Sequence, residues 1–197
     1  MVEILLDVSH YLVVNVLLPC LVDVWSMIVG ISGKARNGKN TLGLFLAMRL
    51  KALGVTSTQL AFAHRLKKDA ILMGWNGEKD LVGRFALQKY GELMRELDKD
   101  YWINALGKSN PEIRNDVGLW IITDVRYKNE AEWIRKNEGV LIRIERVGID
   151  KPGREHISET DLDIWTDWDW MVSANDGDLQ EIWDMAGRIA EWICYRM

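Results

Sequence analysis

The chain has 197 residues, of which 48% are hydrophobic and 27% are charged, and its formal net charge at pH 7 is -4. This length and apolar content are enough to bury one good core, so we expect a single compact domain with appendages. The acidic balance argues against a nucleic-acid-binding surface, because such surfaces are usually basic and clustered.

Cysteine and histidine spacing indicates neither a disulfide framework nor a metal site. Cys20 and Cys194 lie far apart with no C-x-x-C spacing, and His10, His64 and His156 form no metal-ligand pattern. The simplest interpretation is a reduced, cytoplasmic protein.

The first 26 residues are unusual. Residues 4–25 are strongly apolar, yet only fifteen residues separate Asp7 from Asp23, whereas a spanning helix needs about 20 predominantly apolar residues. No positively charged stretch precedes them, so we expect neither a membrane span nor a secretory signal. We interpret residues 1–26 as an N-terminal extension or a mis-assigned start; the alternative is an extra helix or strand packed on the core.

From Met27 onward, apolar strand-like runs alternate with helical stretches. The pattern predicts strands over 27–32, 57–63, 118–124, 140–147 and 169–174. It predicts helices over 40–54, closed by Gly54, over 129–139 and over 178–197, with a mostly helical region over 65–106 that is broken near 74–77. The alternation predicts an α/β fold in three layers, with a parallel sheet flanked by helices.

Residues 33–41, GKARNGKNT, nearly match the phosphate-binding loop pattern G-x-x-x-x-G-K-[ST]. Gly33, Gly38 and Lys39 are in register, but Asn40 stands where a hydroxyl should hold magnesium, and Thr41 follows one place late. The glycines and lysine alone would occur by chance in roughly one chain in fifteen of this length.

The context of this segment favours phosphate binding over its alternative, a glycine-rich turn. A predicted strand precedes the loop and a predicted helix follows it, so N–H groups from Lys34 to Thr41 can converge on phosphate oxygens while Lys39 reaches the β and γ phosphates. We therefore expect an ATP phosphate site here.

Asp124 and Arg126 follow an apolar run that ends at the carboxyl edge of the predicted sheet. Ligands bind at this edge in open parallel sheets, and a second carboxylate typically handles Mg²⁺ or its waters. A solvated turn is the alternative for this pair.

The chain lacks the N-K-x-D motif of GTPases and is too short for a helicase or AAA-type motor. A helical stretch between the second and third strands, residues 64–107, suits a small kinase in which it closes on the phosphoryl acceptor. Binding of a monophosphate needs cationic side chains. The stretch supplies several Arg and Lys residues, although each of them could instead lie on a solvated helix face. The stretch contains Arg65, Lys67, Lys68, Arg84, Lys89 and Arg95.

Several motifs over residues 27–194 resemble those of bacteriophage deoxynucleoside monophosphate kinases in order and spacing. The most specific is ITDVRYKNEAEWIR (122–135), followed by the H-x-S-E of His156 to Glu159. The others are ISGKARNGKNT, FAHRLKKDA, LQKYGELMRELDKDYWINAL and WDWMVSANDGDLQEI.

The resemblance implies transfer of the γ-phosphoryl group of ATP to a deoxynucleoside 5′-monophosphate on a P-loop kinase domain over 27–197. It implies an ATP phosphate loop of Gly33, Lys34, Gly38, Lys39, Asn40 and Thr41. It implies acceptor binding by Lys67, Arg84 and Arg95, with Gln88 available to a base edge. Asp124 and Arg126 would lie between the substrates, beside Asn129 and Glu130.

By the same resemblance, residues of about 148–162 form a lid-like segment, and a later turn lies near the ATP base. The lid-like part includes Arg143, Arg154 and His156, and the turn is Asn175, Asp176 and Gly177. Magnesium would be held by Asn40, Thr41 and Asp124. The partners implied are the deoxynucleoside monophosphate, with no nucleic acid and no membrane, and we leave a homodimer open.

Two residues depart from the family pattern. Phage members commonly have G-K-D-T in the loop, so neutral Asn40 predicts either a lower metal affinity or a greater reliance on Asp124. His64 stands where an acidic or small residue is expected. Two other functions stay open. One is a kinase for another small acceptor such as dephospho-coenzyme A, and the other is a non-catalytic nucleotide-binding protein, which Asn40 favours. Trp165, Trp168 and Trp170 could stack on a base, or simply pack.

Overall fold

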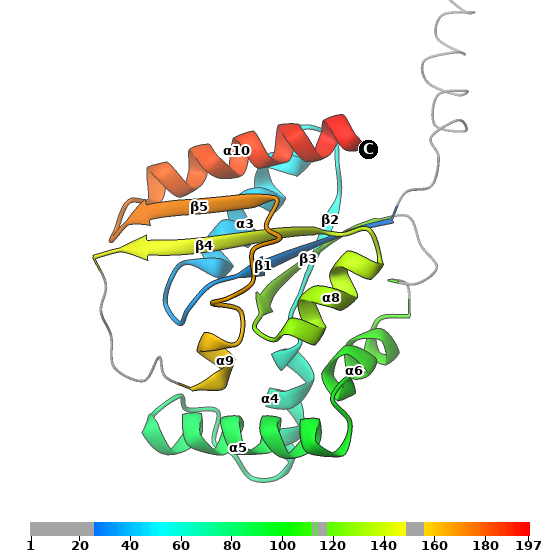
Figure 1. Cartoon of the computed structure of the whole chain (residues 1–197), viewed down its shortest axis with the longest axis vertical. Coiled ribbons are helices and arrows are strands. Elements are labelled where there is room, and N and C mark those ends of the chain that lie inside the picture. Colours follow the sequence, from blue (N-terminus) through cyan, green and yellow to red (C-terminus); the bar gives the residue numbers. More distant parts are fainter. Residues whose placement is uncertain (1–25, 112, 114–117, 149–155) are drawn as a thin grey trace, which may run out of the picture.

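The structure is a computed structural model that describes residues 26–111, 113, 118–148 and 156–197. Five parallel strands form one sheet in the order β2-β3-β1-β4-β5 (Figure 1). They are β1 (Ser26–Ser32), β2 (Ser57–Leu60), β3 (Gly118–Val125), β4 (Val140–Val147) and β5 (Trp170–Asn175). The described helices are α3 (Lys39–Ala52), α4 (Ala63–Leu72), α5 (Leu81–Leu97), α6 (Tyr101–Ser109), α8 (Lys128–Lys136), α9 (Ile157–Thr160) and α10 (Leu179–Arg196).

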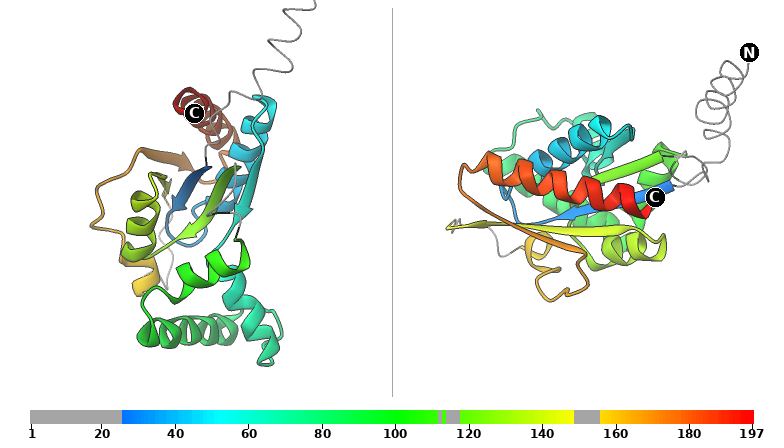
Figure 2. Two further views of the ribbon diagram at one scale, coloured as in Figure 1. Left: turned by 90° about the vertical axis from the view of Figure 1, so that its right-hand side faces the viewer. Right: turned by 90° about the horizontal axis from the view of Figure 1, so that it is seen from above.

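Helices cover both faces of the sheet, which confirms the predicted three-layer α/β fold with a parallel sheet. Figures 1 and 2 show α3 and α10 on one face and α8 on the other. Side chains alternate accordingly along β1, since Val29 and Ile31 pack in the core with α3 and α10 while Ile28 packs with α6 and α8. Among the described residues, no helix is long and apolar enough to cross a membrane.

Strand register brings the predicted site residues to one edge. In the parallel pairing, Ser32 at the end of β1 lies opposite Val125 of β3 and opposite Arg143 of β4. The residues that follow Ser32 and flank Val125 therefore meet at the carboxyl edge of the sheet, where α4, α5, α6 and α9 also lie (Figure 1).

Helix α3 approaches β3 closely, because Gly43 has no side chain. A Cβ atom on Gly43 would lie 2.5 Å from Cγ2 of Thr123, which is closer than two carbon atoms can pack. Thr123 is β-branched and sits in a strand, so its methyl group has little freedom to turn away. This contact fixes the distance between the helix that follows the phosphate loop and the strand that carries Asp124.

Two parts of the predicted secondary structure were wrong in detail. The predicted strand over 57–63 is too long: β2 ends at Leu60 and α4 begins at Ala63, because the Asp124 carboxylate accepts the N–H groups of Phe62 and Ala63. The region over 65–106 has a second break before α6, where the Asp98 carboxylate accepts the N–H of Asp100.

Other boundaries agree closely with the predictions. Strand β4 has the predicted bounds, and Gly54 follows α3 with a φ of 84°, as expected of a residue after a helix end. The prediction for residues 1–26 lies outside the described residues except for Ser26, which begins β1. Residues 149–155 of the predicted lid-like segment also lie outside them.

The Gly43 contact yields a matched test of the fold. Gly43→Ala should lower the free energy of unfolding by about 1–3 kcal/mol, because overpacking forces α3 and β3 apart. Gly187→Ala in α10 meets only the flexible Arg49 side chain, at 3.3 Å, and should be neutral or raise the free energy of unfolding by up to about 1 kcal/mol. Urea unfolding of both variants measures this, and equal effects would contradict the packing argument.

Candidate active site

The phosphate loop, residues 33–38, joins β1 to α3 and contains two glycines with positive φ. The φ angles are 151° at Gly33 and 93° at Gly38. A Cβ atom on Gly33 would lie 2.3 Å from the carbonyl oxygen of Ile144, so only glycine fits beside β4 there. The first turn of α3 follows at once and directs N–H groups and the positive end of its dipole toward the loop. This is the order of elements that phosphate binding requires.

Lys39 lies within the curve of the loop. Its side chain is largely buried, and Nζ donates to the carbonyl oxygens of Gly33 (2.6 Å) and Lys34 (2.9 Å). Asn37 is buried too and donates to the Ile144 carbonyl oxygen (3.3 Å), which holds the loop against β4. The ammonium group is therefore placed to reach a phosphate bound by the loop.

Asn40 and Thr41 lie in the first turn of α3, as predicted for the loop sequence. Asn40 is exposed and Thr41 is half-buried. An exposed amide can offer its carbonyl oxygen to a metal-bound water but brings no charge.

Asp124 lies at the carboxyl end of β3 and holds the start of α4. Its Oδ1 accepts the N–H of Phe62 (2.8 Å) and its Oδ2 accepts the N–H of Ala63 (2.9 Å). Helix N–H groups stabilise such a carboxylate. An ionised carboxylate has about four lone-pair sites, so these two bonds leave capacity for a cation or its waters.

Lys67, on α4, lies in the same electrostatic environment. Burial lowers its pKa below the ordinary value, the charges of Lys79 and Arg126 lower it further, and Asp124 opposes the shift. Lys67 therefore lies in the electrostatic field of Asp124 and Arg126, and its place beside the acceptor stays a prediction.

Arg126 connects the sheet edge to α9. Its Nη1 donates to the Ser158 carbonyl oxygen (3.2 Å) and forms an ion pair with Glu159. The other oxygen of Glu159 accepts the N–H of Ala35 in the phosphate loop (2.5 Å). One carboxylate thus joins the loop to the arginine predicted to lie between the substrates.

A second acidic residue joins the loop to β4. Asp163 accepts from Lys34 (3.0 Å) and from Arg143 (2.9 Å), and Arg143 also donates to the Leu162 carbonyl oxygen (3.0 Å). Burial raises the pKa of Asp163, but the hydrogen bonds from Arg143 and Lys34 outweigh it and hold the pKa below its ordinary value. Arg143 is buried, so these hydrogen bonds replace the water that its guanidinium lacks.

Glu130 organises the start of α8 and the side chain of Arg95. It is 2% exposed and accepts the N–H groups of Arg126 (2.8 Å) and Tyr127 (3.1 Å). Its other oxygen pairs with Arg95 (3.2 Å), whose guanidinium lies 3.7 Å from the centre of the Tyr127 ring. Burial raises the pKa of Glu130 to about 7, although Arg95 and the two N–H groups act in the opposite direction.

Two other predicted acceptor residues, Arg84 and Gln88, also lie on α5. Arg84 is exposed and donates to the Lys79 carbonyl oxygen (3.0 Å), and Gln88 is half-buried. In the described part of the chain, no hydrogen bond or ion pair connects either side chain with Asp124 or Arg126. Their roles stay predictions.

His156 links α9 to α5. Its Nδ1 accepts the N–H of Ser158 (3.1 Å), so in that tautomer Nε2 donates to Glu92 (2.7 Å). Arg154, predicted for the same segment, lies outside the described residues.

The turn predicted to lie near the ATP base follows β5. Asn175 is the last residue of β5, Asp176 pairs with Arg146 of β4 (2.9 Å), and Gly177 has a φ of 85°. A Cβ atom on Gly38 would lie 3.8 Å from the Arg146 guanidinium, so this turn is close to the loop.

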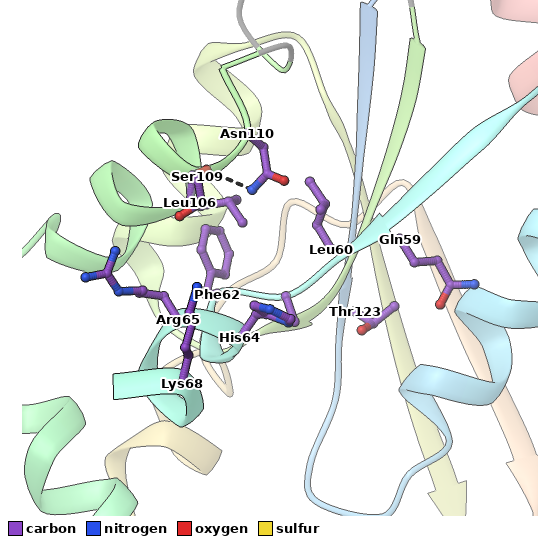
Figure 3. A pocket seen from close by; sticks show the side chains of 11 residues that line it. Gln59, Leu60, Phe62, His64, Arg65, Lys68, Leu106, Ser109, Asn110 and Thr123 are labelled. Atoms are coloured by element: carbon purple, nitrogen blue, oxygen red, sulfur yellow. Dashed lines mark hydrogen bonds between the residues drawn. The ribbon is translucent and has the colours of Figure 1, made fainter. Parts of the chain in front are cut away.

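A cavity of about 470 Å³ lies at the carboxyl end of β2, between α4 and α6 (Figure 3). His64, Arg65 and Lys68 line it from α4, opposite Gln59 and Thr123 of the sheet. His64, one of the two residues that depart from the family pattern, therefore lines this cavity.

A family model for deoxynucleotide monophosphate kinases matches residues 84–185. The chain belongs to this family. The matched part holds Asp124, Arg126, Arg143 and Glu159, whereas residues 33–38 precede it, so their assignment to phosphate binding rests on their sequence and geometry. No curated protein gives a significant match to the chain.

The candidate site offers few protein ligands to a metal ion. Among the described residues, no three His, Cys, Asp or Glu side chains are grouped to hold a metal ion. Mg²⁺ in kinases usually keeps several waters and binds one or two carboxylates plus substrate phosphates. Asp124 beside the loop fits that donor set.

Sequence reasoning missed Glu159 and Asp163 as site residues. Both lie in HISETDLD, and the H-x-S-E pattern marked Glu159 as part of a motif without giving its role. Neither contact with the loop can be foreseen from local sequence, because Ala35 and Glu159 are 124 positions apart.

Glu130 generates a pH-dependent prediction. Its pKa rises from 4.5 in the unfolded chain to about 7 in the folded one, so its contribution to stability is present below pH 4.5 and is lost as pH rises through 7. As the pH rises from 4.5 to above 7, the free energy of unfolding of the wild-type protein should fall by on the order of 3 kcal/mol relative to that of Glu130→Gln. Urea unfolding at several pH values measures it; a constant difference would contradict the shift.

Proposed function

We propose that the protein transfers the γ-phosphoryl group of ATP to a deoxynucleoside 5′-monophosphate, giving the diphosphate and ADP. The observation that carries the proposal is the meeting of Lys39, Asp124 and Arg126 at one sheet edge, in a chain of the deoxynucleotide monophosphate kinase family. A glycine-rich turn alone would not need a buried lysine inside it.

The phosphate loop and the start of α3 serve the donor. N–H groups and Lys39 bind the phosphates of ATP, and the turn of Asn175 and Gly177 lies toward its base. A bound Mg²⁺ would supply positive charge that offsets the charge of the phosphates. Asp124 would hold it or its waters, with Asn40 and Thr41 contributing uncharged oxygens.

The acceptor lies on the other side of Arg126. Arg126 follows Asp124 by two residues, Lys67 lies in the electrostatic field of both, and Glu130 and Asp163 hold Arg95 and Arg143. An acceptor phosphate is already an oxyanion, so no strong general base is needed. Catalysis then consists of in-line positioning and charge neutralisation.

Lys39→Ala tests the proposal. It should abolish turnover, because the lysine contacts the transferring phosphoryl group, while the fold survives. Lys51→Ala, at an exposed position of the same helix, is the matched control and should keep wild-type activity. The measurement is ADP release with ATP, Mg²⁺ and a panel of deoxynucleoside monophosphates plus dephospho-coenzyme A.

Near wild-type turnover of Lys39→Ala would show that the loop is not the donor site. Turnover with dephospho-coenzyme A alone would show that this molecule, and not a deoxynucleoside monophosphate, is the acceptor. Nucleotide binding without ADP release would indicate a non-catalytic protein.

A further inference from the structure

The carboxylate of Glu159 lies where two strong anion-binding groups converge. Its Oε2 accepts the Ala35 N–H of the phosphate loop at 2.5 Å, and its Oε1 pairs with the Arg126 guanidinium. The Glu159 side chain is only 6% exposed, so these groups replace water around its charge. Glu159 therefore fills a buried anion position between the loop and the end of β3.

The position has the chemistry of a phosphoryl site. Main-chain N–H groups of a loop and arginine guanidinium groups bind phosphate oxygens in the same way as they bind a carboxylate. The Ala35 N–H cannot serve Glu159 and a phosphate chain with full strength at once. The two anions must compete for it.

Neighbouring contacts hold the same segment on the loop. Asp163 pairs with Lys34 of the loop, and Ser158 accepts from Arg126. The His156 ring bonds Glu92 on α5, so the segment is fixed at its other side as well. Glu159 is thus held at the anion position by its surroundings.

We propose that Glu159 is a placeholder for a phosphoryl group: its carboxylate keeps the anion position between Ala35 and Arg126 until a phosphate chain displaces it. The identity of the natural anion rests on the proposed function. Displacement releases Arg126 from Glu159 next to the entering phosphate. Glu159 therefore weakens phosphate binding, but it holds Arg126 in position before a phosphate binds.

Asp161 supplies a matched control. It lies in the same segment and carries the same charge, but it accepts from the Lys128 N–H (2.7 Å) and lies 3.9 Å from Lys128 Nζ. Removing its charge changes the long-range field of the segment without touching the Ala35 or Arg126 contact.

The test is the dissociation constant of inorganic tripolyphosphate, measured by calorimetry without acceptor. Glu159→Gln keeps the shape and an oxygen that can accept from Ala35, so it should fold. It should bind tripolyphosphate about tenfold more tightly, since a hydrogen bond to a neutral acceptor is weaker than one to a charged acceptor and is displaced more easily. Asp161→Asn should bind like the wild type. Glu159→Asp keeps the charge but withdraws it from Ala35, and should also bind more tightly.

Equal or weaker binding by Glu159→Gln, an Asp161→Asn gain of the same size, or wild-type binding by Glu159→Asp would each overturn the placeholder. Lack of tripolyphosphate binding by every variant would overturn it too. The ligand has no nucleoside and no turnover occurs, so the proposed function can fail separately. If Glu159→Gln binds tripolyphosphate more tightly but the protein phosphorylates no deoxynucleotide, the placeholder role is supported and the proposed function is contradicted.

Discussion

The parallel register of β1, β3 and β4 is the constraint on which the site depends. Ser32 is level with Val125 and with Arg143, so the loop, the Asp124 to Arg126 turn and β4 reach the same edge. The close approach of Gly43 to Thr123 sets the spacing between α3 and β3. If the pairing of any of these strands shifted by one residue, the side chains of that strand would move to the opposite face of the sheet.

At this edge, carboxylates position the groups that would bind phosphate. Asp124 fixes the start of α4, Glu130 holds Arg95 and the backbone of Arg126, and Glu159 and Asp163 hold Arg126, Arg143 and Lys34. This explains how a chain with a net charge of -4 can present a local anion site. The acidic residues near it are paired with its own cations and N–H groups, and an entering phosphate can replace some of those pairs.

Local pattern was enough to predict the order of strands and helices, including the strand and helix on either side of residues 33–38, and Asp124 near the end of a strand. The bounds of β4 were predicted correctly because β-branched residues recur through Val140–Val147, and a glycine lies at each end of the segment, at Gly139 and Gly148. The end of β2 was not, since it depends on Asp124, 62 positions away from Phe62. The break before α6 depends on a local side-chain hydrogen bond of Asp98, which competes with helix continuation.

The site was predictable in its parts but not in its connections. Motif spacing singled out Lys39 and Arg126, whereas the bridge that Glu159 makes between the loop and Arg126 exists only in the folded chain. His64 shows the same limit: it departs from the family pattern, and only the fold places it in a cavity beside β2.

The central claim is that this sheet edge passes a phosphoryl group directly from ATP to a deoxynucleoside monophosphate. The most direct measurement follows ATP radiolabelled at its γ-phosphorus, incubated with the protein, Mg²⁺ and each deoxynucleoside monophosphate in turn. The account predicts that the label appears in the deoxynucleoside diphosphate of at least one acceptor. Label that stays on ATP, or appears only as inorganic phosphate with every acceptor, would contradict it.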